Sequence, residues 1–269
     1  MPTARFPLIT VVLIAINIVV FGWQLGHPDD QASNPTLAQA QISERDQVNI
    51  EFGAIPAEVT SPGTYCAPLG DDQTADVCGE RADFASDGRF GELGLQQAPW
   101  WVTLATSMFM HGGFLHIIGN MLFLWVFGNN VEDSMGRGRF VAFYLLAGLA
   151  AVYTQSAINP DSTVPTIGAS GAVAGVLGAY LLLHPKARVL TLVFIIFFVT
   201  VIELPALLLL GIWFVLQFLP AVGQLSGPES GGGVAYLAHV GGFAFGLLTI
   251  HAFARFRNER QDEPRIPVY

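Results

Sequence analysis

The sequence predicts an all-α polytopic membrane protein, built as a bundle of six transmembrane helices with a large loop between the first two. Composition is the first reason: of 269 residues, 52% are hydrophobic and 12% are charged, about half the charged fraction of a typical globular domain. The second reason is that six segments approach the roughly 20 apolar residues that a helix needs to cross a bilayer. The third is that thirteen of the 21 acidic residues lie in one stretch, residues 27–99, between the first two segments.

The first apolar segment, residues 7–26, is long for the core of a signal peptide and has no convincing small-residue cleavage site nearby. We therefore expect it to be retained as the first span. Five later segments contain apolar runs that suit the second to the sixth span. They are residues 114–131, 140–158, 166–183, 204–222 and 234–256.

Residues 189–202 are an ambiguous segment, since they are strongly apolar and β-branched but number only 14. A segment of this length is short for a span and typical of an interfacial or re-entrant piece. If it crossed the membrane, every later segment would reverse its orientation. The charges of the loops distinguish six spans from seven.

Basic residues are expected to be enriched in cytoplasmic loops. With an inside N-terminus and six spans, nine of the 12 Lys and Arg residues fall inside: Arg5, Arg137, Arg139, Lys186, Arg188, Arg255, Arg257, Arg260 and Arg265. The outside holds only Arg45, Arg81 and Arg89, and the loops at 159–165 and 223–233 have no Lys or Arg. The predicted topology therefore has six spans, with both termini in the cytoplasm.

Residues 27–99, the acidic insert, carry a net charge of −10, against +1 for the rest of the chain. Nucleic-acid binding is not expected, because it needs a cluster of Lys and Arg on one face. Both cysteines, Cys66 and Cys78, lie in the insert, and a metal site would need more ligands at closer spacing. Their spacing leaves a disulfide and two free thiols equally open. The Pro, Asp, Gln and Gly content of the insert suits limited order.

These features divide the chain into four parts. Residues 1–26 are expected to hold a cytoplasmic N-terminus and the first helix, and residues 27–110 an extracytoplasmic acidic loop that ends in an interfacial segment. Residues 111–256 form the predicted membrane core with helices two to six. Residues 257–269 form a cytoplasmic tail.

Four polar residues are notable within the apolar core, because such groups are costly in lipid unless they face the bundle interior or water. His116 and Asn120 lie on the second span, four residues apart and so on one helix face. Ser170 lies at the start of the fourth span and His239 near the start of the sixth. These three spans all run from outside to inside, so the four residues are expected at similar depth in the outer half of the bilayer.

The fourth and sixth spans each carry a GxxxG pattern, which lets helix backbones approach closely in membranes. The patterns are Gly171 with Gly175, just after Ser170, and Gly242 with Gly246, just after His239. If the two spans pack through these glycines, the serine and the histidine come together at one end of the interface.

A serine beside a histidine suits a hydrolase. A serine hydroxyl is a weak nucleophile until a neighbouring base takes its proton, and histidine is the usual base near neutral pH. Asn120, His116 and the Ser170 backbone N–H at a helix N-terminus are suitable donors to an oxyanion. Each residue also has a simpler interpretation: the serine as a small packing residue, the histidine as a helix–helix contact or as a proton relay in a transporter. Because all four residues are expected at one depth, the sequence supports the hydrolase as well as it supports these alternatives.

Three motifs on three separate predicted spans surround these residues. They are HGGFLHIIGNMLFLWVFGNNVEDSMGRGRFVAFY at 111–144, PTIGASGAVAGVLGAY at 165–180 and AHVGGFAFG at 238–246. In their patterns, H-x-x-x-N, G-x-S-G and A-H-x-x-G-x-x-x-G, and in their order, they resemble the rhomboid intramembrane serine proteases. The resemblance covers nearly the whole membrane core and leaves the acidic insert unexplained.

The resemblance implies a rhomboid-like six-helix bundle that hydrolyses a peptide bond in or next to the transmembrane segment of a single-span membrane protein. It implies Ser170 as the nucleophile and His239 as its general base, in a dyad without an acidic third member. It implies His116 and Asn120 as oxyanion donors, and no metal or cofactor. The expected partners are such substrates and the lipid bilayer, and the expected location is the plasma membrane, with the active site open to the outside.

The chain departs from the family pattern at two places. Many members have an aromatic residue four positions after the serine that packs on the histidine, and here that position is Ala174. Many members also have a Trp-Arg pair in the first loop, whereas here Trp100 and Trp101 precede Val102. The first departure leaves two alternatives open: another residue supports the ring of His239, or the histidine is held less firmly.

Two other functions remain as alternatives. A catalytically inactive rhomboid-like protein would use the same fold to bind membrane-protein clients, but such proteins typically lack the serine or the histidine. A transporter or channel would need charged residues along a path through both leaflets, whereas here the polar residues stop in the outer half. The protease is the preferred interpretation, and the inactive client-binding protein is the runner-up.

Overall fold

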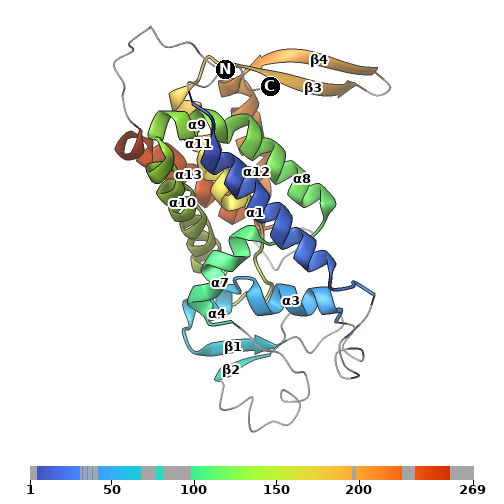
Figure 1. The fold of residues 1–269 in the computed structure, drawn as a ribbon. Helices are drawn as coiled ribbons and strands as arrows, with labels where there is room; N and C mark the ends of the chain where they lie inside the picture. The colour runs from blue at the N-terminus through green and yellow to red at the C-terminus, as the bar shows by residue number, and fades with distance from the viewer. Residues whose placement is uncertain are drawn as a thin grey trace.

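The computed structural model of the chain describes residues 5–30, 32, 35, 38, 42–67, 77–80, 98–195, 198–225 and 234–254. These residues are mostly helical, as the sequence predicts (Figure 1). Five helices are long and apolar enough to cross a membrane. They are α1 (Leu8–Leu25), the continuous run of α8 (Phe114–Phe123), η2 (Leu124–Gly128) and α9 (Asn129–Met135), α10 (Arg137–Ile158), α12 (Ala206–Gln224) and α13 (Tyr236–Phe253).

The fourth predicted span is shorter than expected, because its helix, α11 (Ser170–Leu183), begins four residues after Thr166. Thr166 pairs with Ala54 of the acidic insert, and Gly168 has a φ of +130°, so the residues before α11 are not helical. At 1.5 Å per residue, α11 is about 21 Å long. Every residue from Gly171 to Tyr180 is buried, so α11 is the central helix of the bundle.

The ambiguous segment, residues 189–202, is not a membrane-spanning helix. It lies in an antiparallel hairpin of β3 (Arg188–Ile195) and β4 (Phe198–Pro205). β-Branched residues favour strands, and the hairpin returns the chain to its own starting point before α12 begins. This return is what a six-span topology needs from the segment.

The described part of the acidic insert is folded, so limited order is the wrong expectation for it. It contains α3 (Glu44–Phe52), α4 (Pro56–Thr60) and a hairpin of β1 (Thr64–Ala67) and β2 (Val77–Glu80). Cys66 and Cys78 face each other in this hairpin and form a disulfide. The insert lies at the end of the bundle opposite the β3–β4 hairpin (Figure 1).

The predicted interfacial segment that follows the insert forms two short helices. They are α7 (Trp100–Thr106) and η1 (Ser107–Phe109). Trp101 exposes 63% of its surface, whereas Leu104 and Met108 are buried. One face of the segment is therefore packed on the bundle, and the exposed tryptophan suits an interfacial position.

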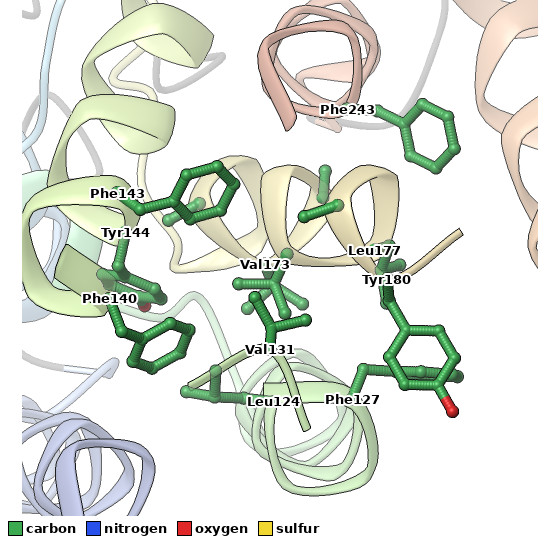
Figure 2. Close-up of a cluster of buried hydrophobic side chains, with 14 of the residues drawn as sticks. Leu124, Phe127, Val131, Phe140, Phe143, Tyr144, Val173, Leu177, Tyr180 and Phe243 are labelled. Atoms are coloured by element: carbon green, nitrogen blue, oxygen red, sulfur yellow. The ribbon is translucent and has the colours of Figure 1, made fainter. Parts of the chain in front are cut away.

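The hydrophobic core packs around α11. Figure 2 shows side chains from the second membrane helix and from α10 gathered on α11, with Phe243 of α13 on a further side; they include Leu124, Phe127, Val131, Phe140, Phe143 and Tyr144. The ring of Phe127 meets the ring of Tyr180 edge-on at 4.9 Å between centroids. Helices on several sides therefore hold α11 in place.

The helices α11 and α13 are in direct backbone contact. The carbonyl oxygens of Gly171 and Gly175 lie directly against the Cα atoms of Gly242 and Gly246, where an added Cβ would collide with them. The two GxxxG patterns therefore meet, as the sequence predicts. This contact brings the first turns of α11 and α13 side by side.

A buried carboxylate joins α1 to the rest of the bundle. Glu132 of α9 is 4% exposed, and its oxygens accept hydrogen bonds from the N–H of Ile9 at 3.0 Å and from the N–H and hydroxyl of Thr10 at 2.8 Å. Both backbone donors belong to the first turn of α1, where N–H groups have no partner within the helix. Glu132 thus acts as the cap of α1.

A second buried carboxylate lies in the insert. Glu58 of α4 is 2% exposed, and its Oε1 accepts a hydrogen bond from the N–H of Cys66 at 2.8 Å. Burial raises the pKa of Glu58 from 4.5 to about 7, and the hydrogen bond from Cys66 opposes this rise. Burial therefore makes the folded insert favour the protonated carboxyl group, even though the hydrogen bond from Cys66 favours the carboxylate.

We expect the insert to lose stability as the pH rises. The folded state holds the Glu58 proton more tightly than the unfolded state, so this contribution is full below pH 4.5 and falls by about 3 kcal/mol up to pH 7. Hydrogen exchange should show a larger protection factor for the Cys66 amide at pH 5 than at pH 7.5. The Glu58→Gln variant keeps an acceptor but does not titrate, so an equal pH dependence in that variant would contradict the assignment to Glu58.

Candidate active site

The four polar residues that the sequence places at one depth line a single cavity. The cavity has a volume of about 890 Å³ and lies among α8, α11, α12, α13 and the loop at 162–168. His116, Asn120, Ser170 and His239 are all in its wall. In the described ranges, no three side chains of His, Cys, Asp or Glu converge as metal ligands do.

Ser170 and His239 are in direct contact. Ser170 is the first residue of α11, and His239 lies in the first turn of α13, with Ser170 Oγ 2.8 Å from His239 Nε2. The glycine contacts between α11 and α13 bring these two turns together. A hydroxyl at this distance can donate its hydrogen to an unprotonated imidazole nitrogen.

His116 and Asn120 face the same cavity from α8. Asn120 is 7% exposed and donates one amide hydrogen to the carbonyl oxygen of His116 at 3.1 Å, which leaves its second amide hydrogen for another acceptor. The Nδ1 atom of His116 accepts from the N–H of Gly112 at 3.3 Å. In the neutral ring the proton is then on Nε2, which becomes a donor.

Gly168 separates His116 from Ser170. A Cβ at this position would lie 2.8 Å from Cε1 and Nε2 of His116 and 3.4 Å from Ser170 Oγ. The N–H of Gly168 donates to the carbonyl of Ser107 at 2.8 Å, which holds the φ of +130° in place. A glycine is needed here both for this backbone angle and to leave the space between the two side chains open.

The N-terminus of α11 adds backbone donors to the site. The N–H of Val173 makes the first bond of the helix, to the carbonyl of Ala169 at 2.9 Å. The N–H groups of Ser170, Gly171 and Ala172 precede it and have no partner within the helix. They lie at the positive end of the helix dipole, which favours a negative charge beside Ser170.

The acidic insert holds the loop that leads to Ser170. Ala54 and Thr166 exchange two backbone hydrogen bonds, at 2.8 and 3.1 Å, and the N–H of Ala57 donates to the carbonyl of Ser162 at 3.1 Å. Ser162 and Thr166 also line the cavity. The insert therefore supports one wall of the site, a role that its composition does not reveal.

Two residues of α12 contact His239, and the sequence analysis missed both contacts. Gln217 Oε1 lies 2.8 Å from His239 Nδ1, and the ring of Trp213 lies 6.2 Å from the imidazole ring. Neither residue is ionisable, and none of the three motifs lies on the fifth span. A polar amide in an apolar helix is the signal that would have identified Gln217.

Comparisons with known proteins give one consistent result. The model of the rhomboid domain matches residues 98–256, more than half of the chain. The chain is 40% identical to the rhomboid protease GluP of Bacillus subtilis over 87 residues, which are 32% of this chain and 16% of that protein. It is 29% identical to rhomboid protein 1 of Saccharomyces cerevisiae, a mitochondrial protein, over 55% of this chain and 40% of that one.

A third relative is the chloroplastic rhomboid-like protein 11 of Arabidopsis thaliana, 27% identical over 61% of this chain and 57% of that protein. Each match thus covers less than two thirds of the relative's length. The matched domain contains the whole cavity wall formed by α8, α11, α12 and α13. On the extent of this match, the chain belongs to the rhomboid family.

Proposed function

We propose that the chain is an intramembrane serine endopeptidase that hydrolyses a peptide bond in or next to the transmembrane segment of a single-span membrane protein. The observation that carries the proposal is the 2.8 Å contact between Ser170 Oγ and His239 Nε2, in a cavity that also holds His116 and Asn120. A relative named as a rhomboid protease supports the same activity.

In the proposed mechanism, His239 Nε2 takes the proton of the Ser170 hydroxyl while Oγ attacks the carbonyl carbon of the scissile bond. The resulting oxyanion accepts hydrogen bonds from Asn120 Nδ2, His116 Nε2 and the Ser170 backbone N–H. His239 then gives the proton to the departing amine as the C–N bond breaks. Water, activated by His239, hydrolyses the acyl-enzyme ester and restores the Ser170 hydroxyl.

The length of α11 supports a site below the membrane surface. A helix of about 21 Å is about 9 Å shorter than the hydrocarbon core of a bilayer. We propose that residues 166–169, which precede the helix, complete this crossing as part of the fourth of six spans. Ser170 then lies beneath the outer surface, where the cavity admits water from one side of the membrane.

The distribution of charge supports an outward-facing site. Arg5, Arg137 and Arg139 line one pocket, together with the two acidic residues Glu132 and Asp133, at the end of the bundle away from the acidic insert. We propose that this basic end is cytoplasmic, together with both termini, and that residues 27–110 and the active site face the outside. Of the predicted tail, residues 257–269 lie outside the described residues. We propose the plasma membrane as the location, although the relatives include mitochondrial and chloroplastic proteins.

The orientation can be tested with a reporter enzyme that is active only outside the cytoplasm. Fused after the C-terminal residue, the reporter should be inactive, and inserted into the acidic insert at residue 90 it should be active. The positive-inside rule predicts this pattern from the nine basic residues on the proposed cytoplasmic side. An active C-terminal fusion would contradict the topology.

The activity can be tested with the purified full chain in lipid vesicles and a fluorescent single-span substrate. We expect the wild-type protein to cut the substrate at a bond in or beside its transmembrane segment, which mass spectrometry of the products locates. Binding of the substrate without cleavage would favour the client-binding alternative. Equal cleavage by the Ser170→Ala variant would reject Ser170 as the nucleophile.

Asn120→Ala is expected to lower kcat by about 10²- to 10³-fold, the usual cost of removing one oxyanion donor. The measurement is the initial cleavage rate in the same vesicles at saturating substrate. Asn17→Ala is a matched control, because Asn17 is also buried and also donates its amide to the carbonyl four residues earlier, at 2.8 Å. If both variants lost the same activity, Asn120 would have a structural role only.

A further inference from the structure

His239 has two ring nitrogens, and the proposed dyad accounts for only one of them. Nε2 faces Ser170 Oγ, and Nδ1 faces Gln217 Oε1, both at 2.8 Å. Gln217 lies on α12 and lines the cavity, whereas the other glutamine of that helix, Gln224, does not line it. The imidazole is therefore held between two helices, α11 and α12.

The contact at Nδ1 determines which tautomer the ring adopts. To take a proton from Ser170, Nε2 must be unprotonated, so the neutral ring must carry its hydrogen on Nδ1. A carboxamide oxygen accepts hydrogen bonds and donates none. Gln217 Oε1 facing Nδ1 therefore stabilises the tautomer that base catalysis needs, and the contact also limits rotation of the ring.

The location of Gln217 in α12 also points to a specific role. Its neighbours Leu216 and Phe218 are exposed on the surface of the bundle, whereas Gln217 is half-buried and lines the cavity. An amide in an apolar helix costs free energy unless it has a hydrogen-bond partner. Nδ1 of His239 is that partner.

The same helix supplies an aromatic ring to His239. Trp213 lies one turn before Gln217, on the same helix face, with its ring tilted 36° from the imidazole at 6.2 Å. On α11, the residue one turn after Ser170 is Ala174, which is fully buried and whose methyl group is too small to hold a ring. Two aromatic rings therefore lie near His239: Trp213 of α12 and, at 6.3 Å between centroids, Tyr236 of α13 itself.

We propose that Gln217 is a positioning residue, which holds His239 in the tautomer and orientation that accept the proton of Ser170. Trp213 packs beside it and takes the place of a large side chain at position 174. The inference rests on the proposed function, since it assigns Gln217 to the same site. It also makes the dyad dependent on α12, a helix that otherwise buries only Ala206, Leu210 and Ala221.

The test compares two replacements of Gln217 in the full chain in lipid vesicles. Gln217→Met keeps the length of the side chain and removes the acceptor, and Gln217→Glu keeps the acceptor. We expect Gln217→Met to lower kcat about 10- to 100-fold at unchanged KM, less than the roughly 10⁴-fold cost of losing the carboxylate that orients histidine in a Ser-His-Asp enzyme. Gln217→Glu should remain within about 3-fold of the wild type, because the acceptor is retained.

A second measurement does not need a peptide substrate. A fluorophosphonate probe forms a P–O bond with Ser170 Oγ and releases fluoride, so its rate of labelling reports the nucleophilicity of the hydroxyl. Labelling should slow in Gln217→Met by the same factor as kcat. Gln224→Met is the matched control, because Gln224 lies on the same helix and donates its amide to the carbonyl of Val234 at 2.9 Å, away from His239.

The outcomes separate this inference from the proposed function. A wild-type protein that neither cleaves nor is labelled would contradict the proposed function. Cleavage and labelling rates in Gln217→Met within two-fold of the wild type would overturn the role of Gln217 alone. Equal losses in Gln217→Met and Gln217→Glu, or in Gln224→Met, would also overturn it, because the effect would then follow from packing.

Discussion

Replacing Ser170 by alanine is expected to lower the rate of cleavage by about 10⁴-fold or more, since it removes the oxygen that attacks the scissile carbonyl. His239→Ala should cause a loss of similar size, because the hydroxyl 2.8 Å away would have no base to take its proton. The double variant should be no slower than either single variant, because two groups that act as one unit do not contribute additively. Initial rates in lipid vesicles measure all three losses.

Two replacements outside the cavity provide the controls for this prediction. Ser134 donates its hydroxyl to the carbonyl of Asn130 at 2.9 Å, and His251 lies in the last turn of α13; neither lines the cavity. Ser134→Ala and His251→Ala should therefore cleave at the wild-type rate. Losses that multiplied in the Ser170→Ala, His239→Ala double variant would contradict a dyad, because each residue would then act independently.

The sequence was sufficient to predict most of the helical bundle. α1 spans Leu8–Leu25 against a predicted 7–26, and α10 ends at Ile158 as predicted. Long apolar runs locate such helices because a helix that crosses lipid must be apolar along its whole length. The prediction for these helices therefore depended on local composition alone.

The start of the fourth helix could not be predicted in this way. Residues 166–169 are as compatible with a span as those that follow, but Thr166 is paired with Ala54, more than a hundred residues earlier. Gly168 is held at a positive φ by the carbonyl of Ser107. These contacts join segments that are distant in the sequence, so the hydropathy of residues 166–169 cannot predict them.

The two cysteines illustrate the same limit. Twelve positions separate Cys66 from Cys78, and this spacing alone is compatible with a bond and with free thiols. The register of the β1–β2 hairpin places the two residues opposite each other. The pairing thus depends on a strand register that the sequence of the insert does not reveal.

The candidate site was largely predictable because its residues lie in motifs that the fold brings together. His116, Asn120, Ser170 and His239 lie on neighbouring helices and line one cavity. Gln217 was missed because it belongs to no motif. Its contact with His239 depends on how α12 is rotated about its axis, which the uniformly apolar sequence around it does not determine.

Gly242→Ala is expected to cause a large loss of both stability and activity, although Gly242 is not one of the reacting groups. An added Cβ would collide with the carbonyl oxygen of Gly171 and would lie 3.0 Å from its carbonyl carbon. Since both partners are backbone, the helices α11 and α13 must separate. We expect a loss of about 3 kcal/mol in the free energy of unfolding, or roughly 6–12 °C in Tm, together with a loss of about 10²-fold in kcat.

Gly211→Ala is the matched control, because Gly211 also lies inside a membrane helix but has no atom within 4 Å of an added Cβ. It should keep both Tm and kcat, since alanine favours a helix over glycine. A Gly242→Ala variant with a lower Tm and an unchanged kcat would contradict the link between packing and catalysis. We expect the two losses together, because Gly171 directly follows Ser170 and Gly242 lies one turn after His239. Any widening of the helix contact at these glycines therefore separates Ser170 Oγ from His239 Nε2.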